Sequence, residues 1–477
     1  MSAADLDLRL HLLRTTDSLP APLVETFRTF LLSAPEEAVF RMSPVRWAAA
    51  HNATEQQAID LFLHATHAGI LEFAWGILCP GCLAFLTTPG ALRTIDRKHC
   101  GFCNLDINRS FDDRVEVSFT VSPTVRQIRF HSPATLDLRQ DAVRLYFSSS
   151  IVPDSQPHTV FAAGIVHADR IPAGGEQTIR VTLGRGNTTL LAPAHHAVCA
   201  LKASPEHTGP RSVSVELFDG YTIPEAVQVP LGEVEVRVRN RLTHPLGYVL
   251  APSCGGIWPA PAPPGEPLNH PIMPYLTGPR LIMSQTFRQL FRAASIPAEG
   301  GLEVKGTTLL FTDLKGSTAL YERIGDIAAY DLVRRHFAIL RSLIAAEGGA
   351  IVKTIGDAVM ASFAHPLAAV QAVTRMNQQL ALMCQDSLHL KIGLHTGTCI
   401  AVELNDQLDY FGRTVNIAAR VQGLAGPGEI VCTSYVYATD GVPQAIARAG
   451  FTVEHARVPL RGINGEVAVV RCRPQPT

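Results

Sequence analysis

The sequence predicts an α+β protein with a ferredoxin-like domain in its C-terminal half. From residue 306 onward the hydrophobic residues alternate between strand and helix spacing in the order β-α-β-β-α-β. Between residues 105 and 251, short runs with a period of two are separated by Gly, Pro and Asp, as is typical of a β-sandwich. Before these runs the chain is helical and carries two CxxC pairs. The predicted order is therefore a helical region, a cysteine-rich segment, a β-sandwich and the α+β domain.

The composition is typical of a folded protein with two to four domains. The chain has 477 residues, of which 47% are hydrophobic and 17% are charged, and its formal net charge is −1. This charge gives no attraction to nucleic acid or to an anionic membrane. No run of 18 apolar residues occurs, and the N-terminus lacks the basic start and cleavage site of a signal peptide. We therefore expect a cytoplasmic protein with reduced thiols that binds neither nucleic acid nor membranes.

Residues 1–78 are predicted to form helices followed by a strand, in a winged-helix-like arrangement. Thr54 and Gln57 have the spacing of a capping box, and Gly69 is typical of a helix end. Four apolar residues then alternate as in a strand: Leu71, Phe73, Trp75 and Ile77. The second helix of this arrangement contains no Lys or Arg and cannot neutralise phosphates, so a structural or protein-binding role is expected.

Residues 79–104 contain two cysteine pairs that predict a zinc ribbon. The pairs CPGC and CGFC are separated by seventeen residues. They supply four thiolates, those of Cys79, Cys82, Cys100 and Cys103. Four thiolates fit one tetrahedral Zn²⁺ ion and leave no open position for a substrate, so the zinc is expected to be structural. The alternatives are a redox dithiol or two disulfides, but neither requires both pairs, and a reducing compartment disfavours them.

Residues 105–251 are predicted to form a β-sandwich without a catalytic site. Four runs alternate with a period of two: 115–121, 178–183, 212–218 and 233–238. His195 and His196 are adjacent in this region. Because neighbouring strand residues point to opposite faces, these two histidines are poor joint metal ligands.

Residues 252–302 are predicted to link the two halves of the chain. Nine prolines lie between residues 252 and 279, which indicates a semi-rigid linker rather than a core segment. A short coupling helix is predicted in the stretch SQTFRQLFRAA, and the last domain then spans residues 303–477.

The pattern of this last domain brings two acidic residues together. The strand TTLLFTD ends at Asp313, and Asp357 lies in the turn between the strands AIVKTI and AVMASF. Because the predicted strand order lets these strands pair, both carboxylates should lie at one edge of the sheet. Two such carboxylates are suitable ligands for Mg²⁺ or Mn²⁺, with phosphate oxygens completing the coordination. Lys353 lies four residues before Asp357, about 13 Å away on an extended strand, so the two charges need not pair.

Four motifs in this half resemble those of the class III nucleotidyl cyclase catalytic domain. They are FTDLKGST (311–318), KTIGDAVMASF (353–363), IGLHTG (392–397) and DYFGRTVNIAAR (409–420), and they occur in the family's order. The resemblance is specific and covers about residues 303–473, but it does not extend to residues 1–300. It implies an adenylate cyclase, in which the ribose 3′-hydroxyl of ATP attacks the α-phosphate to give 3′,5′-cyclic AMP and pyrophosphate.

The resemblance implies a metal and phosphate site built from the first two motifs. Two Mg²⁺ or Mn²⁺ ions per active site would be held by Asp313, Asp357 and the backbone carbonyl of Leu314. The turn after the first strand would bind the β- and γ-phosphates. Its residues are Leu314, Lys315, Gly316, Ser317 and Thr318. Arg461 would add a further contact to the triphosphate.

The resemblance assigns the base and the transition state to four other residues. Lys353 would donate to adenine N1, and Asp409 would accept from the 6-amino group, whereas guanylyl cyclases of this family typically have Glu and Cys at these two positions. Asn416 and Arg420 are four residues apart on a predicted helix, hence on one face. They would orient the ribose and stabilise the charge on the α-phosphate.

In this family each active site lies between two subunits, so the resemblance implies a head-to-tail homodimer with two shared sites. A regulatory protein or ligand is expected to act on the N-terminal region. Three alternatives stay open: a guanylate cyclase, a non-catalytic nucleotide-sensing or scaffolding protein, and a zinc-ribbon transcription factor. Taken singly, Asp313 suits an ordinary turn and Arg420 an ordinary surface ion pair, but their joint occurrence with the other motif residues favours an active site.

Overall fold

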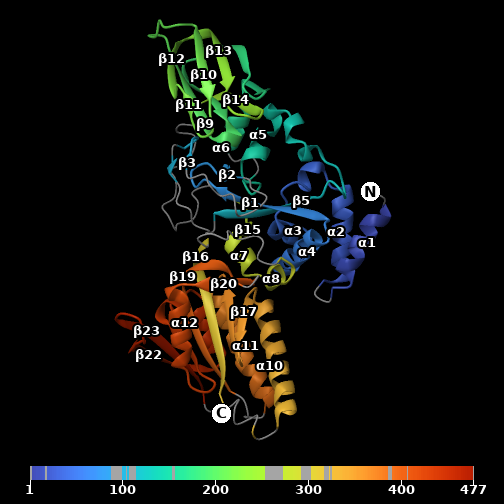
Figure 1. Ribbon diagram of the computed structural model, residues 1–477, viewed down its shortest axis with the longest axis vertical. Coiled ribbons are helices and arrows are strands. Elements are labelled where there is room, and N and C mark those ends of the chain that lie inside the picture. Colours follow the sequence, from blue (N-terminus) through green and yellow to red (C-terminus); the bar gives the residue numbers. More distant parts are fainter. Residues whose placement is uncertain are drawn as a thin grey trace. The chain divides into compact units, whose positions relative to one another are not determined.

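The protein folds into two compact units, which Figure 1 shows in the computed structural model. The N-terminal unit comprises Met1–Ala58, Ala68–Arg109 and Arg114–Leu276, and the C-terminal unit comprises Ile59–His67, Ser110–Asp113 and Thr277–Thr477. The structure describes residues 3–16, 19–87, 99–103, 105–106, 114–152, 156–252, 272–291, 302–315, 322, 325–384, 389–404 and 407–475. None of the described helices is both long and apolar enough to span a membrane.

The chain begins with four helices, as the sequence predicts for this region. They are α1 (Ala3–Arg14), α2 (Ala21–Ser33), α3 (Pro44–Ala50) and α4 (Glu55–His67). The capping box at the start of α4 is confirmed, because Thr54 N donates to Gln57 Oε1 at 3.0 Å and Gln57 N donates to Thr54 Oγ1 at 3.1 Å. Gly69 follows α4 with a φ of 71°, the left-handed conformation expected at a helix end.

A four-stranded sheet follows, and one of its strands was predicted to belong elsewhere. Its strands are β1 (Leu71–Leu78), β2 (Phe85–Thr87), β5 (Val115–Val121) and β15 (Leu276–Thr277), in the order β15-β5-β1-β2. The strand at 115–121 was expected in the β-sandwich, but it pairs with β1. A period of two identifies a strand without identifying its partner. The winged-helix-like arrangement itself stays a prediction.

Two helices, and not strands, lead from this sheet to the sandwich. They are α5 (Leu138–Tyr146) and α6 (Gln156–Ala163), so the sandwich begins later than predicted. Its nine strands are β6 (His167–Ile171), β7 (Glu176–Leu183), β8 (Gly186–Ala192), β9 (Ala197–Ser204), β10 (Ser212–Leu217), β11 (Thr222–Ile223), β12 (Ala226–Pro230), β13 (Gly232–Asn240) and β14 (Leu246–Pro252). They form one sheet in the order β11-β10-β13-β7 and another in the order β12-β9-β8-β14-β6. Buried side chains from both sheets share a single core, as expected for a sandwich.

The link to the C-terminal unit contains two short helices in its described part. They are α7 (Gly278–Ile282) and α8 (Gln285–Leu290); α8 confirms the predicted short helix, and its coupling role stays a prediction. The proline-rich stretch 253–271 lies outside the described residues.

The C-terminal unit has the predicted β-α-β-β-α-β order. Its first elements are β16 (Leu302–Lys315), α10 (Asp326–Ala346), β17 (Ala350–Ile355), β18 (Ala358–Phe363), α11 (Pro366–Cys384) and β19 (His389–Leu404). The first strand therefore runs two residues beyond Asp313. These strands lie in the order β17-β18-β16-β19, which is the ferredoxin-like arrangement.

Further elements extend this sheet and cover both of its faces. They are β20 (Gln407–Phe411), α12 (Arg413–Gly423), β21 (Ile430–Thr433), α13 (Ser434–Tyr437), α14 (Val442–Arg448), β22 (Phe451–Pro459) and β23 (Glu466–Pro474). On one face Cys432 shares a core with α10 and α11. On the opposite face the next residue back, Val431, packs with Ile417 and Val421 of α12. Successive side chains of β21 thus point to opposite faces of the sheet, and each face packs against a different helical layer.

Two glycines of the IGLHTG motif let α12 lie directly on β19. A Cβ atom at Gly393 would lie 2.2 Å from the backbone nitrogen of Gln422, and one at Gly397 would lie 2.6 Å from Thr414 Oγ1. Any larger residue at Gly393 would therefore have to move the helix backbone, because backbone atoms cannot rotate aside.

We expect Gly393→Ala to destabilise the C-terminal unit by about 1–3 kcal/mol, the usual cost of overpacking a core. Gly423→Ala is the matched control, because nothing lies within 4 Å of a Cβ at that position. The free energy of unfolding from urea denaturation checks the difference between the two variants. Equal stability of both variants would contradict the close approach of α12.

Candidate active site and cysteine cluster

The two predicted metal-binding aspartates lie at the same end of two adjacent strands, Asp313 near the end of β16 and Asp357 in the turn before β18. Thr312 of β16 is the register partner of Val359 of β18. Asp313 comes one residue after Thr312, and Asp357 comes two residues before Val359, so in an antiparallel pair both lie just beyond the same point of the ladder. Gly356 has a φ of 62° and forms the tight turn that presents Asp357. This arrangement agrees with the prediction of two carboxylates at one edge.

Both carboxylates are accessible and make no close ion pair with a described residue. The Asp313 side chain is 38% exposed, and its nearest cation in the described part of the chain, Lys391 Nζ, is 4.0 Å away. This separation is too long for a hydrogen bond. His336 of α10 is buried near Asp357, and burial lowers the pKa of His336 to about 4, while the Asp357 charge acts in the opposite direction. The histidine is therefore neutral at pH 7 and does not compensate the charge of Asp357.

The predicted phosphate-binding turn is only partly described. Leu314 and Lys315 were expected in this turn, but both belong to β16 and pair with β19; Leu314 is buried and Lys315 is exposed. Gly316, Ser317 and Thr318 lie outside the described residues. Arg461 is exposed in the turn between β22 and β23, where nothing described fixes its orientation. The role of this turn stays a prediction.

The two predicted adenine-recognition residues contact each other. Lys353 of β17 and Asp409 of β20 are 56 residues apart in sequence, and Lys353 Nζ donates to Asp409 Oδ2 at 2.6 Å. The Asp409 side chain is 7% exposed, and its Oδ1 accepts from Tyr410 N at 2.8 Å, which fixes the carboxylate. The Lys353 side chain is 39% exposed, so the pair is open on the lysine side.

Helix α8 holds the strands that carry this pair. Gln285 Oε1 accepts from Ile351 N of β17 at 2.8 Å, and Arg288 Nη1 donates to Leu408 O of β20 at 2.8 Å. The guanidinium of Arg288 also lies 5.2 Å from the centre of the Tyr410 ring. Sequence analysis predicted the helix but missed these two contacts, because nothing in a short linker helix indicates which strand it bonds to.

Asn416 and Arg420 both lie on α12, as predicted. Both side chains are exposed and four residues apart, so they share one face of the helix. Gly412 precedes the helix with a φ of 126°, a conformation that residues with a Cβ rarely adopt. The contact of α12 with β19 through Gly393 fixes the position of this face.

The four cysteines of the two CxxC pairs meet in the N-terminal unit. The sulfur atoms of Cys79, Cys82, Cys100 and Cys103 all lie within 4.8 Å of one another, and none of them forms a disulfide. The Cys82 and Cys100 sulfurs are 3.7 Å apart. Four thiolates at tetrahedral Zn–S distances are separated by about 3.8 Å, so the donor set fits a closed zinc site.

The surroundings of the cluster act differently on its thiols: burial raises the pKa of Cys82 and the hydrogen bond with Cys100 raises that of Cys103, whereas Cys100 is favoured as a thiolate. Hydrogen bonds from Cys103 and from the other two thiols lower the pKa of Cys100. His196 lies beside the cluster, and one of its ring nitrogens, Nε2, bonds to Phe85 O at 2.9 Å. His195 instead bonds to Asp219 at 2.9 Å. The two histidines thus have separate partners, as the sequence predicts.

We expect Cys100→Ser to remove bound zinc and to lower the melting temperature of the N-terminal unit. One missing thiolate leaves an incomplete tetrahedral site, whose affinity falls steeply. Cys199→Ser is the control, because Cys199 is a buried core thiol outside the cluster. Metal analysis of both purified variants checks the result. A wild-type protein without zinc, under conditions that exclude chelators, would contradict the zinc assignment.

The comparison with known families gives the class of the C-terminal domain. Residues 303–467 match the family described as "Adenylate and Guanylate cyclase catalytic domain", so this part of the chain is a class III nucleotidyl cyclase domain. Residues 3–289 match a family described as "Family of unknown function (DUF5939)". Because this match covers more than half of the 477 residues, the chain belongs to the DUF5939 family.

Three relatives each match about a third of this chain, and the chain spans between about a quarter and two fifths of the two curated relatives. A receptor-type adenylate cyclase of Trypanosoma congolense is 30% identical over 197 residues, which cover 33% of this chain and 26% of that protein. An uncharacterized protein of Mycobacterium tuberculosis is 32% identical over 166 residues, which cover 35% of this chain and 41% of that protein. A solved structure of an adenylate cyclase from Trypanosoma brucei in its monomeric state is 27% identical, with a TM-score of 0.31, and the match covers 36% of this chain and 89% of that one.

Proposed function

We propose that this protein is an adenylate cyclase, which converts ATP into 3′,5′-cyclic AMP and pyrophosphate. The observation that carries the proposal is the 2.6 Å ion pair of Lys353 and Asp409, because it unites the two predicted adenine-recognition residues from distant parts of the sequence. The family of the C-terminal domain supports the reaction class. The name of the trypanosomal relative supports adenine as the base.

The chemistry of this pair is complementary to adenine. The ammonium group of Lys353 donates to an acceptor such as adenine N1, and the Asp409 carboxylate accepts from a donor such as the 6-amino group. Guanine presents a donor at N1 and an acceptor at O6. The Lys353 donor would then face a donor, and the Asp409 acceptor would face an acceptor. Entry of adenine replaces the ion pair with two hydrogen bonds to the base, so the buried Asp409 carboxylate and the half-exposed Lys353 ammonium group both keep a partner.

The aspartates are proposed to hold two Mg²⁺ or Mn²⁺ ions. Asp313, Asp357 and the Leu314 carbonyl are all oxygen ligands, which these hard cations prefer, and no described cation lies within hydrogen-bonding distance of Asp313. When bound, the ions lower the pKa of the ribose 3′-hydroxyl and offset the negative charge of the triphosphate. The two carboxylates thereby fix where the attacking and leaving oxygens lie.

Residues of α12 are proposed to act on the α-phosphate. Arg420 is exposed and makes no ion pair with a described residue, so its five N–H donors are available. In the transition state its guanidinium stabilises the extra charge on the phosphorus-bound oxygens. Asn416 on the same face orients the ribose, which aligns the 3′-oxygen for attack on phosphorus.

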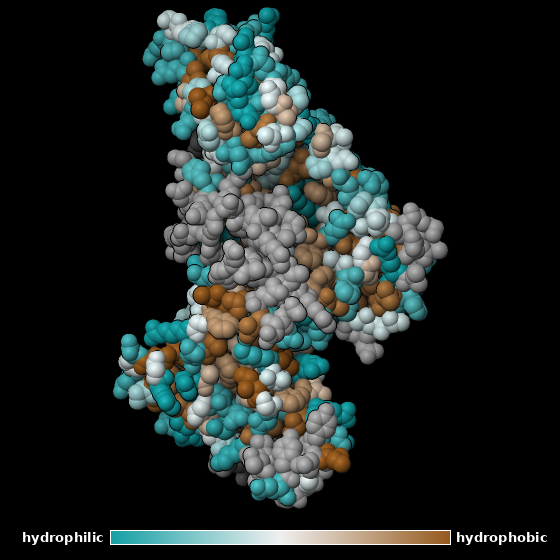
Figure 2. All heavy atoms as spheres, viewed as in Figure 1, coloured by the Kyte–Doolittle hydropathy of each residue, from teal (hydrophilic) through white to brown (hydrophobic). Residues whose placement is uncertain are grey.

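A homodimer is proposed to complete each site. Apolar side chains reach the surface of the C-terminal unit on the face drawn in Figure 2, and exposed large apolar residues flank the adenine pair. Phe411, two residues after Asp409, is 50% exposed, and its register partner Ile400 is 42% exposed. Ile355, two residues after Lys353, is 53% exposed. Exposed apolar groups of this kind next to a site favour a partner subunit at this surface.

The proposal is tested by assaying the purified full-length protein with Mn²⁺ and either ATP or GTP. We expect cyclic AMP from ATP and at least about tenfold less cyclic GMP from GTP, because guanine leaves the buried Asp409 carboxylate and the Lys353 ammonium group without complementary partners on the base. Chromatography of the nucleotide products distinguishes the two activities. Preference for GTP would make the protein a guanylate cyclase, and the absence of both products would favour a non-catalytic nucleotide-binding role.

Helix α8 is proposed to position the adenine pair. We expect Arg288→Ala to raise the KM for ATP up to about tenfold with a smaller change in kcat, because the lost hydrogen bond frees the strand that carries Asp409. Arg288→Lys should restore part of the affinity, since lysine can still donate to Leu408 O. Arg334→Ala is the control, because Arg334 is exposed on α10. An unchanged KM in Arg288→Ala would contradict this role.

A further inference from the structure

A cavity of about 800 Å³ in the N-terminal unit is separate from the cyclase site. Its walls come from the ends of α2 and α3, from α5 and α6, and from the segments around residues 37–43 and 148–152. The volume is within the range of cavities that bind small organic molecules. Six residues decide its chemistry: Phe30, Phe40, Arg41, Arg46, Trp47 and Arg144.

One wall of the cavity is aromatic and rigid. The rings of Trp47 and His51 are stacked, with centres 4.3 Å apart and planes inclined by 17°. Phe30 meets both rings edge-on, at 6.2 Å from Trp47 and 5.3 Å from His51. Because the three rings hold one another in place, the wall offers a preformed surface for a flat apolar group.

The other wall carries arginines with unused hydrogen-bond donors. Each guanidinium has five N–H groups. Arg46 uses Nη2 to reach Ser149 Oγ at 3.2 Å, while its buried Nε has no partner. Arg41 reaches the Leu145 carbonyl at 2.8 Å and that of Arg144 at 3.4 Å, both through Nη1. Arg144 reaches the Glu37 carbonyl at 3.2 Å, also through Nη1. None of these three arginines forms an ion pair with a described carboxylate.

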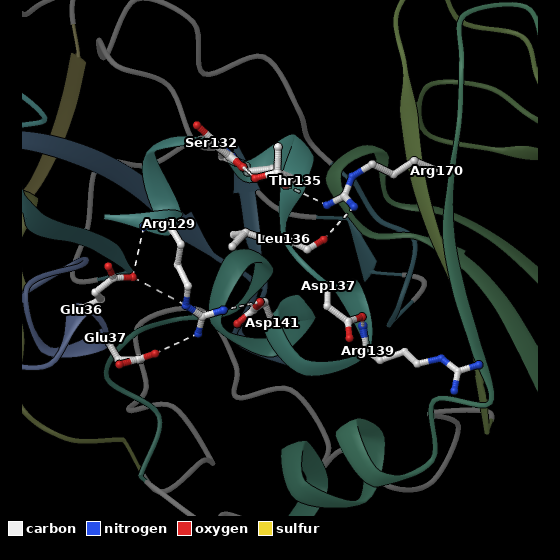
Figure 3. A network of polar contacts seen from close by, with 11 residues as sticks. Glu36, Glu37, Arg129, Ser132, Thr135, Leu136, Asp137, Arg139, Asp141 and Arg170 are labelled. Carbon is white, nitrogen blue, oxygen red and sulfur yellow. Dashed lines mark hydrogen bonds and ion pairs between the residues drawn. The ribbon is translucent and has the colours of Figure 1, made fainter. Parts of the chain in front are cut away.

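The carboxylates near the cavity accept hydrogen bonds from groups other than the cavity arginines. Figure 3 shows Arg129 between Glu36, Glu37 and Asp141, and it donates to Glu37 Oε1 at 2.8 Å and to Asp141 Oδ2 at 2.7 Å. The buried carboxylate of Glu116 accepts from the hydroxyls of three consecutive serines, Ser148 to Ser150. The carboxylates of Glu37, which also lines the cavity, and of Glu116 thus accept hydrogen bonds from groups other than the three cavity arginines. Burial lowers the pKa of Arg41 to about 10, although the nearby charge of Glu116 acts in the opposite direction.

We propose that this cavity binds a small organic anion that combines an aromatic ring with an acidic group such as a carboxylate, sulfonate or phosphate. The ring lies against Trp47 and Phe30, and the acidic group accepts from the unused donors of Arg46 and its two neighbours. Charge-assisted hydrogen bonds of this kind are shorter and stronger than neutral ones. The cavity is the ligand site of the DUF5939 region, and the proposal does not depend on the cyclase activity.

The test compares two fluorescent probes with similar ring systems on the full-length protein. The probe 8-anilinonaphthalene-1-sulfonate carries one acidic group, and N-phenyl-1-naphthylamine lacks it. We expect saturable binding of the sulfonate, with a Kd at least about tenfold lower than that of the neutral probe. Fluorescence titration gives both constants. Equal affinity of the two probes, or the absence of saturable sulfonate binding, would overturn the proposal.

Substitutions locate the binding in this cavity. Arg46→Gln should weaken binding of the sulfonate about tenfold while leaving the neutral probe unaffected. Arg180→Gln is the control, because it removes the same charge from an exposed side chain of the sandwich. If Arg46→Gln is unstable, Arg144→Gln tests the same proposal. The Arg144 side chain is exposed, so this variant should fold like the wild type. If Arg46→Gln and Arg144→Gln both bind the sulfonate like the wild type, the inference is wrong.

Discussion

Asp357→Asn is expected to reduce cyclic AMP formation by about a thousandfold or more while leaving the fold intact. The substitution keeps the size of the side chain but removes the charge that is proposed to hold a divalent cation against the triphosphate. Without that cation the 3′-hydroxyl keeps its high pKa, and the charge of the transition state is not offset. Asp357 is half-buried in a turn, so the effect on stability should be within about 0.5 kcal/mol.

The measurement is product formation from ATP with Mn²⁺, made together with thermal unfolding of each variant. Asp440→Asn is the matched control, because Asp440 is an exposed aspartate in a turn of the same unit, away from β16 and β18. Retention of more than about a tenth of the wild-type rate in Asp357→Asn would show that this carboxylate holds no catalytic metal ion. Loss of the rate in both variants would instead indicate a general effect of charge.

The elements of the C-terminal unit could be predicted because their signals are local. Helix α10 follows from apolar residues three and four positions apart, and β17 and β18 follow from short apolar runs around Gly356. The sheet order follows from the β-α-β-β-α-β sequence of these elements. The strand at 115–121 shows the limit of this reasoning. Its alternation was correct, but its partner β1 depends on contacts distant in sequence.

Some features of the candidate site could likewise be predicted from local sequence signals, whereas contacts between distant residues could not. The spacing of the cysteines indicated the four-thiol cluster, and the turn after β17 indicated an accessible Asp357. The contact of Lys353 with Asp409 has no local signal, because it joins residues 56 positions apart, and only the resemblance to a family linked them. The bonds of Gln285 and Arg288 to the strands beside this pair were not predicted at all. Hydrogen bonds to backbone atoms leave no trace in the sequence of the acceptor.

A heterodimer of Asp357→Asn and Arg420→Ala chains is expected to recover about half of the wild-type activity per dimer. In a head-to-tail dimer one site combines the aspartates of one subunit with the α12 residues of the other. In this heterodimer one of the two sites receives both damaged residues, and the other receives none. Each homodimer of either variant has two damaged sites and should be inactive. Two different affinity tags allow the heterodimer to be isolated and assayed with ATP.

The matched control is the heterodimer of Asp357→Asn with Asp313→Asn. Both substitutions affect the metal ligands, so each of its two sites lacks one aspartate, and no activity should return. A dimer with a complete site inside each subunit predicts inactivity for both heterodimers, since every chain carries one damaged residue. Recovery in the first heterodimer alone therefore requires sites shared between subunits. It would also place Asp357 and Arg420 on opposite sides of one nucleotide, which is the arrangement that the exposed apolar residues beside Lys353 and Asp409 favour.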